Sequence, residues 1–248
     1  MSKAQIITIA EIKGGTGKTT TAAAIAQAGA LDNKRVLCID LDAQANLTAL
    51  FGADPGQRGS YELLNGHPVQ ELIQHTDFNV DIIAGAPNLA AEIPASGSAY
   101  RLKNAIASIL KSYDIIIIDT PPAFGEMTYN ALQACTGVLV ALDADTKALQ
   151  GFYSITDLAR AAKAKNKSLK LLGCIITRYT PRPKLSQKMR ETIEEKAKAL
   201  HCPLLGEIRE GIAIKEAQAY GENLFTYAPK SKPAADYMEI YRKLFKEE

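Results

Sequence analysis

The chain has 248 residues, of which 47% are hydrophobic and 23% are charged, and its formal net charge at pH 7 is +2. This size and composition predict a soluble globular domain with a substantial core, and the charge is too small to indicate nucleic-acid binding by itself. No apolar run approaches the roughly 18 residues needed to cross a bilayer, and the N-terminus lacks the charged-then-apolar pattern of a signal peptide, so we expect a cytoplasmic protein.

Short β-branched runs alternate with helical stretches along the chain. Six runs have near-continuous apolar character, which predicts strands covered on both faces: Gln5–Ala10, Arg35–Asp40, Val80–Ala84, Asp114–Asp119, Gly137–Leu142 and Leu171–Thr177. Helices are predicted at Lys18–Ala30, Tyr100–Ser112, Thr128–Ala134, Ala148–Lys163 and Leu185–Leu200, with a last one at Pro233–Phe245 packed on the outside. The region Phe51–Asn79 is predicted to form short helices and loops at the edge of the sheet.

This alternation predicts an α/β fold, a mostly parallel twisted sheet with helices on both faces and right-handed crossovers. No linker divides the chain, so residues 1–248 are predicted to form a single domain, and no helix-turn-helix is expected before the first strand. The four cysteines lie far apart, and Cys38 and Cys174 sit in apolar runs, which predicts buried free thiols rather than disulfides or metal ligands.

The first strand leads into a glycine-rich segment, Lys13–Thr20 (KGGTGKTT), and then directly into an alanine-rich helix. Glycines let the backbone curl so that its N–H groups cradle phosphate oxygens, and the helix N-terminus adds partial positive charge. Lys18 is expected to reach the β- and γ-phosphates, and the Thr19 hydroxyl to bind Mg²⁺. The segment therefore predicts a P-loop for ATP and Mg²⁺, formed by Gly14, Gly15, Thr16, Gly17, Lys18, Thr19 and Thr20.

The match to the ordinary P-loop pattern, G-x-x-x-x-G-K-[ST], is imperfect. Its first glycine would fall at Ile12, and a second lysine, Lys13, stands next to that position. This form resembles the deviant Walker A loop of the ParA/MinD family of ATPases. The resemblance implies that Lys13 crosses a dimer interface to the nucleotide of the partner subunit, as an arginine finger does, and such fingers are worth roughly 10³–10⁵ in rate.

A second acidic segment, Ile39–Asn46 (IDLDAQAN), ends the second strand. Its two carboxylates, Asp40 and Asp42, fall at the carboxyl end of a strand, where open α/β sheets bind ligands. The segment resembles the family's D-x-D-P-Q-x-N switch, which implies that Asp42 positions or activates the attacking water while Asp40 supports the loop and the metal's water shell. Ala43 replaces the family's proline, so a less rigid loop is expected.

The run Tyr113–Pro122 (YDIIIIDTPP) has the form of a Walker B strand, an apolar wall ending in a carboxylate aimed at the metal. The candidate metal residues are therefore Thr19, Asp42 and Asp119. Thr120–Pro122 and Gly125 resemble the family's second switch. Farther along, Gly173–Tyr179 and Tyr227–Lys232 extend the resemblance over the whole chain, and it implies adenine contacts from Thr177, Arg178 and a loop at Ile208–Arg209.

Within the family, the chain is most similar to ParA/Soj-type partition ATPases. The resemblance implies an ATP-bound homodimer that binds DNA non-specifically, associates with the nucleoid, and segregates a plasmid or chromosome with a ParB-type partner that stimulates slow hydrolysis. Basic residues recur in the C-terminal third, and phosphate neutralisation requires only such a patch. The candidate DNA contacts are Arg182, Lys184, Lys188, Lys215, Lys230 and Lys232, although interleaved glutamates leave a solvated helix face as the alternative.

Three other functions remain as alternatives. A MinD-type ATPase would need an amphipathic membrane anchor in the tail Tyr237–Glu248, whose helical spacing equally fits a docking helix and whose final Glu247 and Glu248 suit an anionic bilayer poorly. A relative that positions a protein cargo is not separated from the partition ATPase by the sequence. A metabolic enzyme is disfavoured, because the bridging cysteines of an iron–sulfur reductase are missing and a ligase is expected to carry additional substrate-binding sequence.

Overall fold

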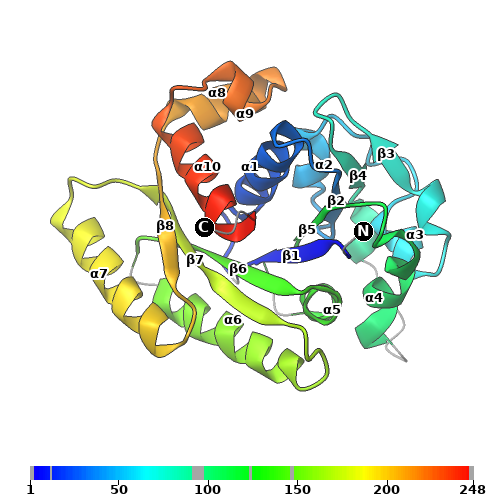
Figure 1. Ribbon diagram of the computed structural model, residues 1–248, viewed down its shortest axis with the longest axis horizontal. Helices are drawn as coiled ribbons and strands as arrows, with labels where there is room; N and C mark the ends of the chain where they lie inside the picture. The colour runs from blue at the N-terminus through cyan, green and yellow to red at the C-terminus, as the bar shows by residue number, and fades with distance from the viewer. Residues whose placement is uncertain (1–2, 12, 91–97, 123–124, 146–147, 246–248) are drawn as a thin grey trace.

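The computed structural model describes residues 3–11, 13–90, 98–122, 125–145 and 148–245. These residues build an eight-stranded sheet with the strand order β3-β4-β2-β5-β1-β6-β7-β8 (Figure 1). Every pairing is parallel except that of β3 with β4, so the predicted fold class is confirmed. The strands are β1 (Gln5–Ala10), β2 (Val36–Asp40), β3 (Ile73–His75), β4 (Asp81–Ile83), β5 (Ile115–Asp119), β6 (Gly137–Asp143), β7 (Lys170–Tyr179) and β8 (Leu204–Arg209).

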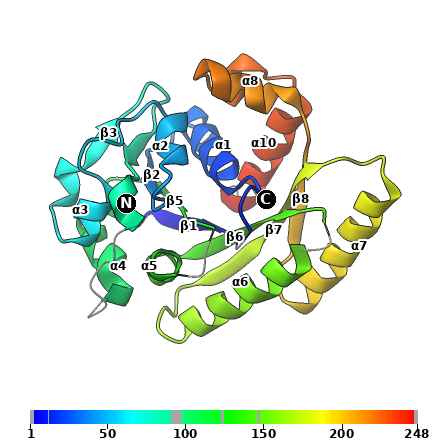
Figure 2. The ribbon, with the colours of Figure 1, turned by 180° about the vertical axis from the view of Figure 1, so that it is seen from behind.

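Helices cover both faces of the sheet, as the two opposite views show (Figures 1 and 2). Successive strand residues point to opposite faces, so Ile7 and Ile9 join one apolar cluster while Ile6 and Ala10 join the other. The first cluster is closed by α1 (Lys18–Leu31), α2 (Asn46–Leu50), α8 (Ile212–Tyr220), α9 (Leu224–Tyr227) and α10 (Lys232–Phe245). The second is closed by α3 (Ser60–Leu64), α4 (Arg101–Ala105), α5 (Glu126–Ala134), α6 (Ala148–Lys163) and α7 (Lys184–Ala199).

The apolar face of α10 is buried within the chain. Tyr237, Ile240 and Tyr241 are almost fully buried, and the helix packs against α1 and β8. The Tyr237 hydroxyl lies 3.2 Å from Thr21 Oγ1, and that of Tyr241 donates to Asp32 at 2.9 Å. The described part of the tail is therefore a docking helix; Glu247 and Glu248 lie outside the described residues. No helix in the described ranges is long and apolar enough to cross a membrane.

Several elements differ from the sequence-based expectation. Strand β8 was not predicted, because its sequence (LLGEIR) mixes glycine and glutamate with the apolar residues and only Ile208 is fully buried. The predicted loop at Ile208–Arg209 is therefore wrong, since both residues end this strand. The predicted helix Tyr100–Ser112 is shorter in the structure, where α4 is followed by a 3-10 turn at Ala107–Ile109. A single longer helix and this combination of helix and turn can both bury Leu102, Ile106 and Ile109.

Other expectations hold. The segment Phe51–Asn79 does lie at the edge of the sheet and contains the short helix α3, but it also contributes the antiparallel strand β3, which was not predicted. All four cysteines are buried free thiols, as predicted. The two central strands, β1 and β5, and their neighbour β2 end at the same edge, and this edge carries the glycine-rich loop and the predicted carboxylates.

Candidate functional site

The loop between β1 and α1 has the backbone that its glycines predict. Gly15 and Gly17 have φ angles of 76° and 79°, in the left-handed region that favours glycine. Gly17 is the N-cap of α1 and has no side chain to cover the first-turn N–H groups. These N–H groups and the positive end of the helix dipole are therefore available to an anion such as phosphate.

Lys18 is the first residue of α1, and its side chain is buried at the base of this loop. Its Nζ donates to the backbone oxygen of Lys13 at 3.3 Å. Burial lowers the pKa of Lys18, while the charges of Asp119, Glu11 and Asp42 oppose that shift. An ammonium group has three donors, so this one retains capacity to bind oxygens of a phosphate.

Asp119 ends β5 directly opposite Asp40, its register partner on β2, and both are fully buried. Burial, together with the charge of Asp40, raises the pKa of Asp119 to about 8, while the nearby Thr19 hydroxyl and Lys18 ammonium act in the opposite direction. Asp119 Oδ1 accepts the N–H of Thr120 at 3.1 Å, but Oδ2 has no hydrogen-bond partner in the described residues. A buried carboxylate oxygen in this state fits a cation.

The donor set around Asp119 suits Mg²⁺ in particular. No group of three or more histidine, cysteine, aspartate or glutamate side chains in the described residues is arranged to hold a metal ion. A cation bound between Thr19 and Asp119 would therefore take its other ligands from phosphates and water, which is how Mg²⁺ is usually held in nucleotide sites.

Asp40 and Asp42 have different surroundings. Asp40 Oδ1 accepts the N–H of Asp42 at 3.0 Å, and Oδ2 accepts the N–H and hydroxyl of Thr48 at 3.0 and 2.8 Å. Asp40 thus holds the loop and the first turn of α2 in place. Asp42 accepts the N–H of Gln44 at 3.0 Å and lies in the wall of an open cleft.

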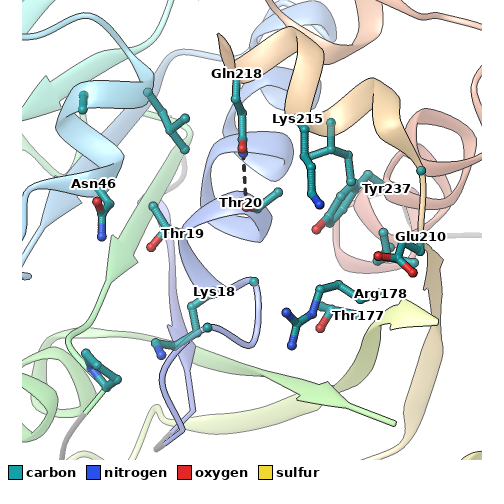
Figure 3. Close-up of a pocket in the computed structure, with 18 of the residues that line it drawn as sticks. Lys18, Thr19, Thr20, Asn46, Thr177, Arg178, Glu210, Lys215, Gln218 and Tyr237 are labelled. Carbon is teal, nitrogen blue, oxygen red and sulfur yellow. Dashed lines mark hydrogen bonds between the residues drawn. The ribbon is translucent and has the colours of Figure 1, made fainter.

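The cleft has a volume of about 690 Å³ and is shown in Figure 3. It brings together most of the residues that the sequence singled out. Among its lining residues are Gly15, Gly17, Lys18, Thr19, Thr20, Asp42, Thr177, Arg178, Ile208 and Arg209. Gly14, Thr16 and Asp119 do not line it; Asp119 is buried behind Thr19.

The residues predicted to contact adenine have further partners. The Thr177 hydroxyl lies 2.6 Å from the Thr16 backbone oxygen, so it braces the glycine-rich loop. Arg178 has a left-handed backbone with φ 51° and forms an ion pair with Asp143. The Arg209 guanidinium is bound by Asp236 of α10, with Nε 2.9 Å from Oδ2.

Part of the cleft lining consists of residues that the sequence did not assign to the nucleotide site. These residues are Asn46 and Leu50 of α2 and Lys215 and Gln218 of α8. The side-chain amide Nε2 of Gln218 donates to Thr20 Oγ1 at 3.2 Å (Figure 3). Lys215, predicted as a DNA contact, lies in this part of the lining. The sequence assigned α8 no nucleotide contact, and it becomes part of the site because the fold packs it near α1.

Lys13 lies at the rim of the site and is not among the residues that line the cleft. Its side chain is 36% exposed and forms ion pairs with Asp143, at 3.3 Å, and with Asp145. Both carboxylates belong to the end of β6 and the residues just beyond it. These ion pairs raise the pKa of Lys13, with the contact to Asp145 as the largest cause and burial opposing it.

Comparison with known proteins identifies similar sequences over nearly the whole chain. A family model described as an AAA domain matches residues 4–171. The chromosome-partitioning ATPase Soj of Thermus thermophilus is 33% identical over 241 residues, which cover 96% of this chain and 94% of that protein. The chromosome partitioning protein ParA of Myxococcus xanthus is 32% identical over 98% of this chain and 88% of its own length.

Solved structures with the same fold have several functions. Cobyrinic acid a,c-diamide synthase from Mycobacterium smegmatis, with bound ADP and magnesium, is 30% identical with a TM-score of 0.83, over 97% of this chain and 94% of that one. A plasmid partition protein from Borrelia burgdorferi is 28% identical with a TM-score of 0.74, over 92% and 99%. The cell division ATPase MinD of Pyrococcus furiosus is 26% identical with a TM-score of 0.80, over 97% and 98%.

The likeness to the diamide synthase corrects one expectation. A ligase was expected to need additional sequence, but this chain spans 94% of the length of that structure. Chain length therefore does not separate the two functions, and the distinction has to come from the site.

Proposed function

Because the chain belongs to the ParA/Soj family of P-loop ATPases, we propose that it is a partition ATPase that binds DNA non-specifically as an ATP-bound dimer. As a member of that family it is an ATPase that uses ATP and Mg²⁺, which agrees with the ADP, ATP analogue and magnesium bound in the mycobacterial relative. The observation that carries the proposal is the position of Lys13, a second lysine at the rim of the cleft and outside its lining.

The chain's own residues define where ATP would bind. The first-turn N–H groups of α1 and Lys18 would bind the phosphates, and Thr19 and Asp119 would hold Mg²⁺, which would supply positive charge to the β- and γ-phosphates. The base extends toward Thr177, Arg178 and the end of β8. Asp42, in the cleft wall, orients the attacking water and accepts its proton.

The dimer follows from the location of Lys13 and of nearby apolar surface. Lys13 exchanges its ion pairs with Asp143 and Asp145 for the phosphates of the partner's nucleotide. Two exposed apolar side chains, Leu185 at 60% and Ile212 at 66%, begin α7 and α8 at the same edge of the sheet. Closure over this edge would cover them, and their burial would favour the dimer.

The proposed DNA-binding surface consists of basic side chains that have no acidic partner. Five of the candidate DNA contacts are exposed and form no ion pair with a carboxylate of the described residues: Arg182, Lys184, Lys188, Lys230 and Lys232. Arg190 and Arg209, by contrast, are paired with Glu194, Glu207 and Asp236. The five are therefore better placed to neutralise DNA phosphates.

These five residues belong to one edge of the sheet. Arg182 follows the carboxyl end of β7, and Lys184 and Lys188 lie one helical turn apart at the start of α7. Lys232 is the first residue of α10, and the next residue, Pro233, packs against Gly211, which follows the neighbouring strand β8. The two are so close that a Cβ added to Gly211 would lie 2.8 Å from Pro233 Cγ. A dimer joins two such surfaces, so ATP binding raises DNA affinity.

The proposed cycle ends with hydrolysis. Loss of the γ-phosphate relaxes the loops around Asp42 and Thr120, the dimer opens and DNA is released. Intrinsic turnover is slow, because the DNA-bound state must persist until a ParB-type partner stimulates it. The protein is then cytoplasmic, and bound to the nucleoid in its ATP state. The membrane alternative is not favoured, because the apolar face of α10 is buried on α1 and β8.

Paired charge reversals test the proposal. Lys184→Glu with Lys188→Glu should abolish ATP-dependent DNA binding while leaving hydrolysis without DNA within twofold. The matched control is Lys165→Glu with Lys167→Glu, at the opposite end of β7, which should retain most of the binding. Equal losses in both double variants, or none in the first, would contradict the proposed DNA surface.

Variants of the catalytic residues test the dimer and the chemistry separately. Lys13→Ala should keep ATP binding but lose ATP-dependent dimerisation or hydrolysis, measured by analytical ultracentrifugation and phosphate release. Asp42→Ala should dimerise with ATP but hydrolyse it at least tenfold more slowly, as expected for loss of a general base. Full activity in either variant would remove that residue from the scheme.

A further inference from the structure

A single buried carboxylate connects the wall of the cleft with the lysine at its rim. The Asp143 side chain, only 8% exposed, ends β6. Arg178 donates to it from Nε at 3.1 Å and also from an Nη atom, and Lys13 donates from Nζ at 3.3 Å. The Thr177 hydroxyl lies 3.4 Å from the same carboxylate. Two cations, one from the β1–α1 loop and one from strand β7, thus share one buried negative charge.

The two cations are held differently. The planar guanidinium of Arg178 contacts both oxygens of Asp143, an arrangement that is stronger and more specific than a single contact. Arg178 has a left-handed backbone, with φ 51°. Lys13 has a second partner, Asp145, which is 41% exposed and can be hydrated when Lys13 leaves.

We propose that Arg178 is a positioning residue for Lys13, the lysine that acts in trans. Arg178 remains as the counterion of Asp143 when Lys13 moves to the nucleotide of the second subunit. The inference rests on the proposed function, since it assumes that Lys13 crosses the dimer interface. It assigns Arg178 a role other than contact with the base, and it gives Asp143 a part in dimer formation.

The physical reason is the high cost of leaving a buried charge without a partner. With Arg178 present, departure of Lys13 leaves Asp143 paired through two charge-assisted bonds. Without Arg178, the departure of Lys13 would leave the carboxylate buried and unpaired, and breaking a buried pair in this way is strongly unfavourable. Removal of Arg178 should therefore lock Lys13 on Asp143, and removal of the Asp143 charge should release it.

A double-mutant cycle tests this coupling. Arg178→Gln should weaken ATP-dependent dimerisation about tenfold more than it weakens binding of a fluorescent ATP analogue to the monomer, a difference that corresponds to about 1.4 kcal/mol. Adding Asp143→Asn should restore dimerisation to within threefold. Arg178→Lys, which keeps the charge, should recover part of the loss. Thermal melting of each variant checks folding.

Three outcomes would overturn the inference. One is normal dimerisation of Arg178→Gln. Another is a loss of analogue binding as large as the loss of dimerisation, not restored by Asp143→Asn, which would make Arg178 a nucleotide contact. The third is strictly additive effects of the two substitutions. The proposed function is tested separately. If Lys13→Ala dimerised and hydrolysed ATP normally, Lys13 would not act on the nucleotide of the partner subunit.

Discussion

Asp40→Ala should destabilise the nucleotide-free protein much more than loss of a typical surface aspartate. The substitution removes the acceptor of the Asp42 N–H group, in the loop that precedes α2, and of the Thr48 N–H and hydroxyl groups, within α2. A buried donor left without a partner costs about 1–3 kcal/mol, so two backbone N–H groups cost about 2–6 kcal/mol. Relief of the repulsion between Asp40 and Asp119 offsets part of this, and we expect a net loss of about 3 kcal/mol.

Thermal unfolding at pH 7 measures the effect. For a chain of this size, each kcal/mol lowers the melting temperature by about 2–4 °C, so Asp40→Ala should melt about 6–12 °C lower. Asp54→Ala is the matched control, because Asp54 accepts one backbone N–H, from Gly56 at 2.8 Å, but is exposed. Its melting temperature should fall by less than about 2 °C, as for most surface substitutions. If the two variants melted at the same temperature, Asp40 would not hold the loop as described.

Four further predictions concern the metal site, the glycine-rich loop and the switch loop. Asp119 has a folded pKa of about 8 against an ordinary 3.8, so its contribution to stability is full below about pH 4 and is lost as pH rises toward 8; Asp119→Asn should flatten that decline in unfolding free energy. Because burial raises the pKa of this carboxyl group, binding of Mg²⁺ and ATP at pH 7 should release a proton from it that is not released in Asp119→Asn, by calorimetry in buffers of different ionisation enthalpy. Thr177→Val removes the bond to the Thr16 backbone oxygen and should weaken ATP binding about fivefold, by fluorescence titration; unchanged affinity would exclude the bracing role. Gly85→Ala would place a Cβ 2.6 Å from the Asp42 backbone oxygen, so it should lower kcat about tenfold with little change in ATP affinity. The control Gly56→Ala, whose added Cβ would lie near only the Asp54 side chain, should leave kcat unchanged.

The phosphate-binding part of the site could be predicted from sequence because each of its motifs is local. The β1–α1 loop, Asp40 with Asp42, and Asp119 each follow an apolar strand directly, and parallel strands bring their carboxyl ends to one edge. The last helix was also predicted, at Pro233–Phe245, but its spacing fitted a docking helix and a membrane anchor equally, and its burial against α1 and β8 decides between them. These features depend on short stretches of chain and on one rule of topology.

The rest of the site depends on which elements become neighbours. The pairing of Asp143 with Arg178 arises because β6 lies beside β7 with Asp143 in register with Thr177, and no spacing in the sequence indicates it. Lys215 could be grouped with the DNA candidates by charge alone, whereas its place in the cleft wall requires α8 to pack near α1. Strand β8 was missed because an edge strand need not be continuously apolar.

The most direct test of the account is the anisotropy of a labelled duplex of arbitrary sequence, titrated with the protein in ATP, ADP or no nucleotide over a salt series. The account predicts binding only with ATP, with an affinity that falls steeply with salt. Five basic residues on each of two subunits allow up to about ten phosphate contacts, so the logarithm of affinity should fall by up to about nine units per decade of salt concentration. Equal binding in all nucleotide states, or none in any, would contradict an ATP-switched partition dimer and leave only the ATPase assignment.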